Sequence, residues 1–280
     1  MKKRVLLTGG TGFVGRNILP VLRESYDVLA PARAELDVYR ADSVDAFLAE
    51  NPVDFLVHCA ICTPANPLDD GKDVLESVLR SFLNFKKHKF EKIVYIGSGA
   101  EYGKDKDIVN AAEDDIGKRL PADEYGLAKY VLNDIARHSD NIYNLRIFGC
   151  YGANEPERRF IRHAIGCCLK NEPVTIRQDC GFSYVFVKDL GRAAVRLLST
   201  AVPAYHDYTI CDGRPLKLSE IAEIVRKETG ADVPVQVLDP VLNREYTGNN
   251  ARFLKEFPDF SFTRIEDGIK REIEWFKGLD

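Results

Sequence analysis

The fold is decided near the start of the chain, by the stretch Val5-Leu6-Leu7-Thr8-Gly9-Gly10-Thr11-Gly12-Phe13-Val14-Gly15. A short apolar run leads into glycines with the spacing G-x-x-G-x-x-G, and a helical pattern follows at residues 17–22. This order of strand, glycine turn and helix is typical of a site where the free N–H groups of a helix start bind a phosphate. We expect Gly9 to allow the tight turn, Gly12 to let the backbone approach a pyrophosphate, and Gly15 to let the helix pack closely on a sheet. The stretch therefore predicts the first strand of a doubly wound parallel sheet.

The composition is that of an ordinary globular chain without a basic excess. The chain has 280 residues, of which 45% are hydrophobic and 29% are charged, and its formal net charge is −4. This length suits either a single domain at the upper end of the size range or one large and one small lobe, and the charge argues against a nucleic-acid partner. No apolar run has the length of a signal peptide or a membrane span, so we expect no membrane association and a cytoplasmic location. Seven cysteines without framework spacing predict reduced thiols, and we expect no metal site.

Apolar periodicity predicts an alternation of strands and helices beyond the first helix. Strands are expected at residues 27–30, 35–38, 53–60 and 92–97, and helices at 43–50, 73–87 and from 123 onward. Ser43 is expected to cap the helix at 43–50. The strand at 27–30 leads to Ala32-Arg33, where NAD-specific proteins usually offer an acid to the ribose. The guanidinium of Arg33 favours the 2′-phosphate of NADP instead.

Ser98, Tyr125 and Lys129 are the candidate catalytic residues. Ser98 follows the strand at 92–97, at the edge where open parallel sheets bind their ligands. Tyr125 and Lys129 stand four residues apart at the start of a predicted helix, so their side chains share one face. Because a tyrosine has an ordinary pKa of about 10, we expect the positive charge of Lys129 to lower the pKa of Tyr125.

The glycine turn, Ser98 and Tyr125-x-x-x-Lys129 together resemble the extended short-chain dehydrogenase/reductase family of nucleotide-sugar epimerases, dehydratases and 4-keto reductases. The resemblance extends over nearly the whole chain. It implies an α/β fold, with a doubly wound parallel-sheet Rossmann domain at residues 1–150 and a smaller α/β lobe at 151–280. The second part is expected to bind mainly the substrate and to return some segments to the Rossmann domain. The resemblance also implies a homodimer through helices near 73–87 and 125–138.

The same resemblance implies roles for individual residues. Tyr125 would be the general acid or base, Ser98 would hydrogen-bond the same substrate oxygen, and Lys129 would hold the nicotinamide ribose. The cofactor-binding residues are expected to be Gly9, Gly12, Phe13, Val14, Gly15, Arg33, Asp37, Val38, Ala60, Tyr125 and Lys129. Contacts to the substrate are expected from Ser98, Gly99, Arg159, Arg177 and Arg252.

Departures from the family pattern help to choose the reaction. In 4,6-dehydratases an Asp-Glu pair follows the serine, whereas this chain has Gly99 and Ala100, which disfavours dehydration. Ala100 also replaces a cysteine of the bifunctional fucose-synthase type. Many members carry an arginine where this chain has Phe182, and Arg177, Arg159 or Arg252 would have to replace it in binding the nucleotide diphosphate.

Three hypotheses about function remain. The first is reduction of a 4-keto (deoxy) sugar nucleotide with NADP(H), which Arg33 favours, although NAD(H) is also possible. The second is C4 epimerisation of a nucleotide sugar with NAD(P). The third is a noncatalytic cofactor-binding regulator on the same fold; such proteins typically lose the tyrosine or the lysine, and this chain has both.

Overall fold

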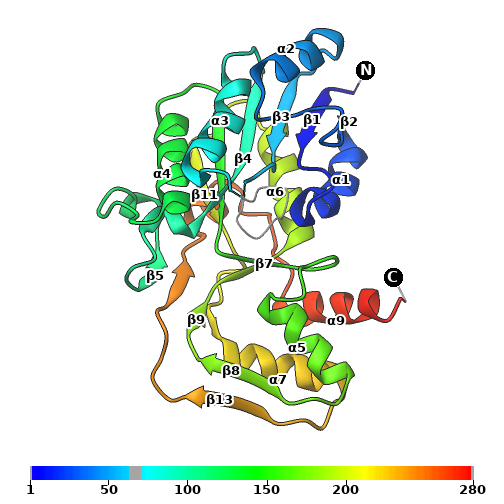
Figure 1. Ribbon diagram of the computed structural model, residues 1–280, viewed down its shortest axis with the longest axis vertical. Coiled ribbons are helices and arrows are strands. Elements are labelled where there is room, and N and C mark those ends of the chain that lie inside the picture. The colour runs from blue at the N-terminus through cyan, green and yellow to red at the C-terminus, as the bar shows by residue number, and fades with distance from the viewer. Residues whose placement is uncertain (1, 63–70, 279–280) are drawn as a thin grey trace.

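The computed structural model describes residues 2–62 and 71–278, and a six-stranded parallel sheet lies at its centre (Figure 1). The strands follow the order β11-β6-β4-β3-β1-β2, and each neighbouring pair is parallel. Their bounds are β1 (Arg4–Thr8), β2 (Asp27–Leu29), β3 (Phe55–His58), β4 (Lys92–Ser98), β6 (Ile142–Ile147) and β11 (Asp207–Ile210). Because the strand order grows outward from β1 in both directions, the predicted doubly wound α/β fold is confirmed.

Helices cover both faces of this sheet. One face packs against α1 (Phe13–Ser25), α6 (Val187–Ser199) and α8 (Ala251–Glu256). The other face packs against α2 (Ala41–Glu50), α3 (Val74–Lys86) and α4 (Glu124–Arg137). Burial on both faces explains why the strands are continuous apolar runs in the sequence. The helices α3 and α4 pack against each other, and a homodimer through them stays a prediction.

Whereas α6, β11 and α8 return to the central sheet, the other segments of the chain after β6 build a second, smaller part, below the sheet in Figure 1. Its core lies among α5 (Phe160–Leu169), α7 (Leu218–Thr229), α9 (Ile265–Phe276) and β8 (Val174–Gln178). The strand β8 pairs with β13 (Val235–Asp239), and β7 (Gly149–Tyr151) pairs with β10 (Tyr184–Phe186). A further sheet joins β12 (Leu216–Lys217), β9 (Gly181–Phe182), β14 (Tyr246–Gly248) and β5 (Ile108–Ala111). Since β5 precedes α4 in the chain, this sheet links the two parts.

The predicted strand at 35–38 is wrong. Leu36 and Val38 are buried as a strand pattern requires, but the segment pairs with no other strand of the described chain. Its N–H groups bond locally, with Leu36 donating to the carbonyl of Ala32 and Asp37 donating to Oγ of Ser43 at 3.0 Å. Ser43 therefore does not cap α2, which begins at Ala41 after an N-cap at Arg40.

Within the described ranges 2–62 and 71–278, no helix combines the length and the apolar character needed to cross a bilayer. All seven cysteines lie in this part of the chain, and none forms a disulfide, in agreement with the prediction of free thiols. The same residues contain no group of three or more His, Cys, Asp or Glu side chains that could hold a metal ion.

Two buried glutamates lie in the smaller part. Glu155, on the loop after β7, is 4% exposed, and Glu272, on α9, is 1% exposed. Oε2 of Glu155 and both carboxylate oxygens of Glu272 have no hydrogen-bond partner among the described residues. Burial raises the pKa of both carboxyls well above the usual range; Glu155 raises that of Glu272 further, and Arg162 offsets only part of the rise. The folded state therefore favours the protonated, neutral form of both glutamic acids.

The stability of the fold should fall as the pH rises from the ordinary glutamic acid pKa of about 4.3 toward the raised folded-state values. In that interval the folded chain binds protons that the unfolded chain has lost. The neutral amide in Glu272→Gln should therefore raise Tm at pH 9 by several degrees and change it much less at pH 5. Thermal denaturation at both pH values measures the effect, with the exposed Glu274→Gln on the same helix as control. An equal change at both pH values would contradict the prediction.

Candidate active site

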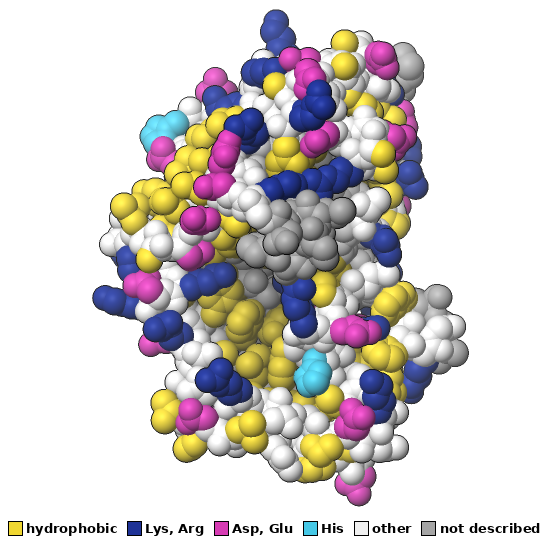
Figure 2. Space-filling view, viewed as in Figure 1, with side chains coloured by type: hydrophobic (Ala, Val, Ile, Leu, Met, Phe, Trp, Pro, Cys, Tyr) yellow, Lys and Arg dark blue, Asp and Glu magenta, His cyan; other side chains and the backbone are white. Residues whose placement is uncertain are grey.

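The carboxyl edge of the central sheet opens into a cavity of about 530 Å³ between the two parts. On the face seen in Figure 2, hydrophobic side chains gather in a hollow where the larger and smaller parts meet. A second pocket of about 340 Å³ shares the glycine turn with this cavity and continues along the sheet edge toward Arg33 and Val38. The two volumes together form an elongated site along the sheet edge at which parallel folds bind ligands.

The glycine turn has the form of a phosphate cradle. Gly9 has φ +69°, and a Cβ there would lie 2.7 Å from the backbone nitrogen of Ala60. A Cβ on Gly15 would lie 2.1 Å from the carbonyl oxygen of Gly9, so neither position can carry a side chain. No side chain caps α1 at its N-cap, Gly12, and the first residues of the helix line the cavity. Unsatisfied N–H groups at a helix start fit an anionic group such as a pyrophosphate.

Most of the residues predicted to bind the cofactor line these two pockets. Arg33, Val38 and Ala60 line the second pocket, while Val14 and Gly15 line the main cavity. Asp37 lines neither pocket, because it is held by its own loop, where Oδ1 accepts a hydrogen bond from the N–H of Tyr39 at 3.0 Å.

Ser98 lies at the last position of β4 and at the start of the 3₁₀ turn η2 (Gly99–Tyr102). Its backbone N–H donates to Oε1 of Glu101 at 2.8 Å, and its Oγ accepts from the N–H of Ala100 at 3.2 Å. This reciprocal pair of bonds is a capping box, which fixes the direction of the serine side chain. Ser98 is 7% exposed and lines the cavity together with Tyr125 and Lys129. The three predicted catalytic residues therefore meet in one site.

Tyr125, in the first turn of α4, is held as a neutral phenol. Burial raises the pKa of Tyr125 to about 12, and a hydrogen bond with Ser98 offsets only part of this rise. Desolvation dominates, so the net shift of this pKa is upward, and a lowering effect of Lys129 stays a prediction. At neutral pH the hydroxyl of Tyr125 carries its proton and can donate it.

Lys129 lies one turn further along α4 and is 5% exposed. Its Nζ donates to the carbonyl oxygen of Ile96 at 2.6 Å and lies 5.9 Å from the ring centroid of Tyr125. Burial lowers the pKa of Lys129 to about 8, although Glu101 opposes this effect. The ammonium group therefore begins to lose its charge near the upper end of the physiological pH range.

The residues predicted to bind the substrate do not all reach the cavity. Arg159 lines it, with one guanidinium nitrogen donating to the carbonyl of Cys150 at 2.9 Å. Arg177 is exposed on β8 and lines none of the site. Arg252 is drawn into an ion pair with Asp207 at 2.8 Å, below the sheet edge. Gly99 is buried beneath the cavity, where Phe148 leaves no room for a side chain. Of the residues expected to contact the substrate, Ser98 and Arg159 therefore line the cavity, whereas Arg177, Arg252 and Gly99 do not.

Sequence reasoning missed Tyr246, Lys104 and Phe148, which also line the cavity. The ring of Tyr246 packs against that of Phe148 at a centroid distance of 4.8 Å. Nζ of Lys104 lies 5.5 Å from the ring centroid of Tyr125 and 5.7 Å from that of Tyr246. These residues stand in no recognisable motif. They meet only because β14 pairs with β5.

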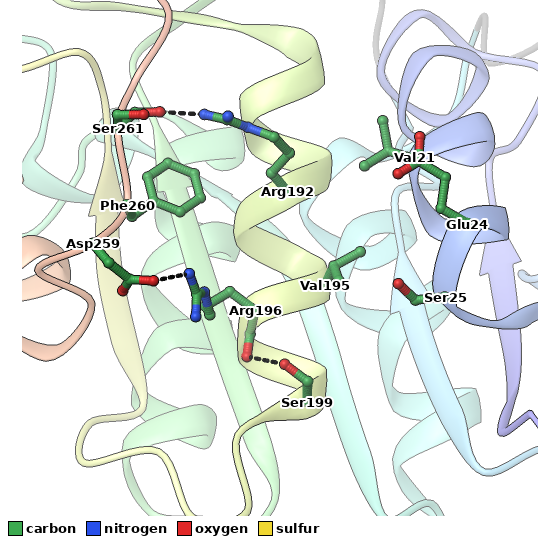
Figure 3. Close-up of a pocket in the computed structure, with 10 residues that line it drawn as sticks. All are labelled: Val21, Glu24, Ser25, Arg192, Val195, Arg196, Ser199, Asp259, Phe260 and Ser261. Atoms are coloured by element: carbon green, nitrogen blue, oxygen red, sulfur yellow. Dashed lines mark hydrogen bonds and ion pairs between the residues drawn. The ribbon is translucent and has the colours of Figure 1, made fainter.

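A separate pocket of about 350 Å³ lies between α1 and α6 (Figure 3). Both of its arginines have partners, since Arg192 bonds to the carbonyl of Ser261 and Arg196 pairs with Asp259. It contains neither the glycine turn nor Ser98 or Tyr125, and we assign no function to it.

Residues 5–211 match the model of the NAD dependent epimerase/dehydratase family. The chain belongs to this family. Its fold agrees with that membership, and the protein is an enzyme of the extended short-chain dehydrogenase/reductase type. The noncatalytic alternative is not favoured.

Individual proteins resemble the chain over almost all of its length. A probable UDP-arabinose 4-epimerase from Arabidopsis thaliana is 24% identical over 98% of this chain and 80% of its own length. The structure of a GDP-L-fucose synthetase from Naegleria fowleri bound to NADP has a TM-score of 0.86 at 15% identity and covers 99% of this chain and 93% of that chain. A structure of GDP-mannoheptose C4 reductase from Campylobacter jejuni with NADP bound has a TM-score of 0.83 at 17% identity. It covers 99% of this chain and 98% of that chain.

Proposed function

We propose that this enzyme is an NADP(H)-dependent reductase of a 4-keto (deoxy) sugar nucleotide. The observation that carries the proposal is the protonated phenol of Tyr125 beside Ser98 at the edge of the glycine-turn cavity. Reduction of a ketone adds a hydride to carbon and a proton to oxygen, and the reduced nicotinamide supplies the hydride. Tyr125 donates the proton to the carbonyl oxygen, while the Ser98 hydroxyl hydrogen-bonds the same oxygen. A donor with a pKa of about 12 is in the correct protonation state for this direction.

The preference for NADP(H) rests on Arg33. This residue lines the second pocket beyond the glycine turn, and its guanidinium carbon lies 5.4 Å from the ring centroid of Tyr39. A guanidinium at this position suits a phosphate on the adenosine ribose, and two of the matching structures contain NADP. NAD(H) remains possible as a second cofactor.

Arg33→Ala should weaken the binding of NADPH about tenfold or more and leave that of NADH nearly unchanged, because only NADPH carries the 2′-phosphate. Fluorescence titration with each cofactor measures the two dissociation constants. The control is Arg40→Ala, since Arg40 is exposed, pairs with Asp42 and lines neither pocket. An equal loss for NADPH and NADH would exclude the phosphate contact.

The substrate class follows from the shape and the charge of the main cavity. The cavity is long enough to extend beyond the catalytic hydroxyls toward Lys104, Arg158 and Arg159, which line it and offer positive charge to a diphosphate. Phe182 and Tyr246 provide aromatic surface against which a base or a sugar ring can pack. The names of the matching proteins, which include UDP- and GDP-sugar enzymes, support a nucleotide sugar.

Incubation of the enzyme and NADPH with a panel of 4-keto-6-deoxy sugar nucleotides tests the reaction. We expect stoichiometric loss of the NADPH absorbance with at least one substrate, together with formation of the 4-hydroxy product. The second candidate is C4 epimerisation, which the UDP-arabinose 4-epimerase relative favours. A 4-epimeric product from a UDP- or GDP-sugar without net consumption of cofactor would establish that reaction instead.

Tyr125→Phe should lower kcat with the accepted substrate by about 100-fold or more, because it removes the proton donor. The dissociation constant for NADPH should change little, since the ring is retained. Tyr130→Phe, on the same helix but outside the cavity, is the matched control. Unchanged turnover in Tyr125→Phe would refute the assignment of Tyr125 as general acid.

A further inference from the structure

Tyr246 reaches the catalytic serine from a distant part of the chain. It begins β14, which pairs with β5 and with β9. Its hydroxyl oxygen lies 3.4 Å from Oγ of Ser98. Phe148 and Phe182 hold the ring at centroid distances of 4.8 and 5.1 Å, so the direction of the hydroxyl is fixed by packing.

The space for this hydroxyl exists only because residue 99 has no side chain. A Cβ on Gly99 would lie 2.8 Å from the Tyr246 hydroxyl oxygen and 2.6 Å from the ring of Phe148. Gly99 follows Ser98 directly, so a side chain at this position would separate the tyrosine from the serine. The glycine that sequence reasoning assigned to substrate binding instead makes room for a phenol.

The other hydrogen bonds of Ser98 determine whether its Oγ or the Tyr246 hydroxyl is the donor in the contact between them. Oγ of Ser98 already accepts the N–H of Ala100. In the reaction its single proton, like that of Tyr125, which also hydrogen-bonds with Ser98, is directed to the carbonyl oxygen of the substrate. A phenol is a stronger acid than an aliphatic alcohol and therefore the better donor of the two. Burial raises the pKa of Tyr246, so this phenol is protonated at neutral pH.

We propose that Tyr246 is a positioning residue whose hydroxyl donates to Oγ of Ser98 and thereby directs the Ser98 proton to the carbonyl oxygen of the substrate. This inference rests on the proposed ketone reduction. The distance of 3.4 Å exceeds the usual 2.7–2.8 Å, and the bond shortens when Ser98 donates, since hydrogen bonds in a chain strengthen one another.

A double-mutant cycle tests the proposal in the intact enzyme. Tyr246→Phe should lower kcat about tenfold and change KM less than twofold, because the ring and its packing are retained. In a Ser98→Ala background the same substitution should lower kcat less than twofold, since the serine through which it acts is missing. Tyr102→Phe is the control, because this buried phenol stacks on the same Phe148 but donates to the carbonyl of Ala112. Additive losses in the double variant, or no loss in Tyr246→Phe, would overturn the proposal.

A spectroscopic measurement separates this inference from the proposed reaction. With tyrosine labelled by ¹³C at Cζ, the Tyr246 signal is identified by its loss in Tyr246→Phe. Ser98→Ala should shift this signal and leave that of Tyr143, whose hydroxyl bonds to the carbonyl of Asp140, unchanged. An unmoved Tyr246 signal would overturn the contact even in an active enzyme. Failure of every 4-keto sugar nucleotide to react would refute the reductase assignment while the NMR result still decides the contact.

Discussion

The geometry of the active site depends on a fully buried ion pair between Glu101 and Arg146. Their side chains are 0% exposed, and Nε of Arg146 lies 2.7 Å from Oε2 of Glu101. The same glutamate accepts the N–H of Ser98, and the same arginine bonds to Asp207 at 3.1 Å, so the pair connects the ends of β4 and β6 with the start of β11. Removing either partner would leave a buried charge, at a cost of about 3–5 kcal/mol. The position of Ser98 therefore depends on the same ion pair that stabilises the sheet.

The charge of Glu101 also influences the acids and bases above it. It raises the pKa of Tyr125 and of Tyr246, in the same direction as their burial, and it supports the protonated form of Lys129. A buried carboxylate below the cavity thus favours protonated groups around the reacting oxygen. This bias suits a site that gives a proton to its substrate, and it explains why proximity of Lys129 alone does not produce a phenolate.

The sequence predicts those parts of the site that lie close together in the chain. The glycine turn and the Tyr125-x-x-x-Lys129 spacing are local patterns, and both occur where they were expected. The prediction of a strand at 35–38 was wrong because burial of alternate residues does not indicate whether a partner strand exists. Arg252 does not reach the cavity because it pairs with Asp207, and this contact joins distant segments of the chain. Tyr246 was missed for the same reason, since only the pairing of β14 with β5 brings it to the site.

Three aromatic rings complete the substrate side of the cavity, and they come from different segments. Phe148 follows β6, whereas Phe182 and Tyr246 lie in the sheet that joins the two parts of the molecule. Phe148 fits only because Gly99 and Gly248 have no side chains, and a Cβ on Gly248 would lie 2.2 Å from its ring. The same packing around Phe148 therefore joins the smaller part to the larger one and places the Tyr246 hydroxyl. A side chain at either glycine would displace Phe148 and, with it, the ring of Tyr246 that faces Ser98, so the shape of the cavity and the surroundings of Ser98 cannot be altered independently at these positions.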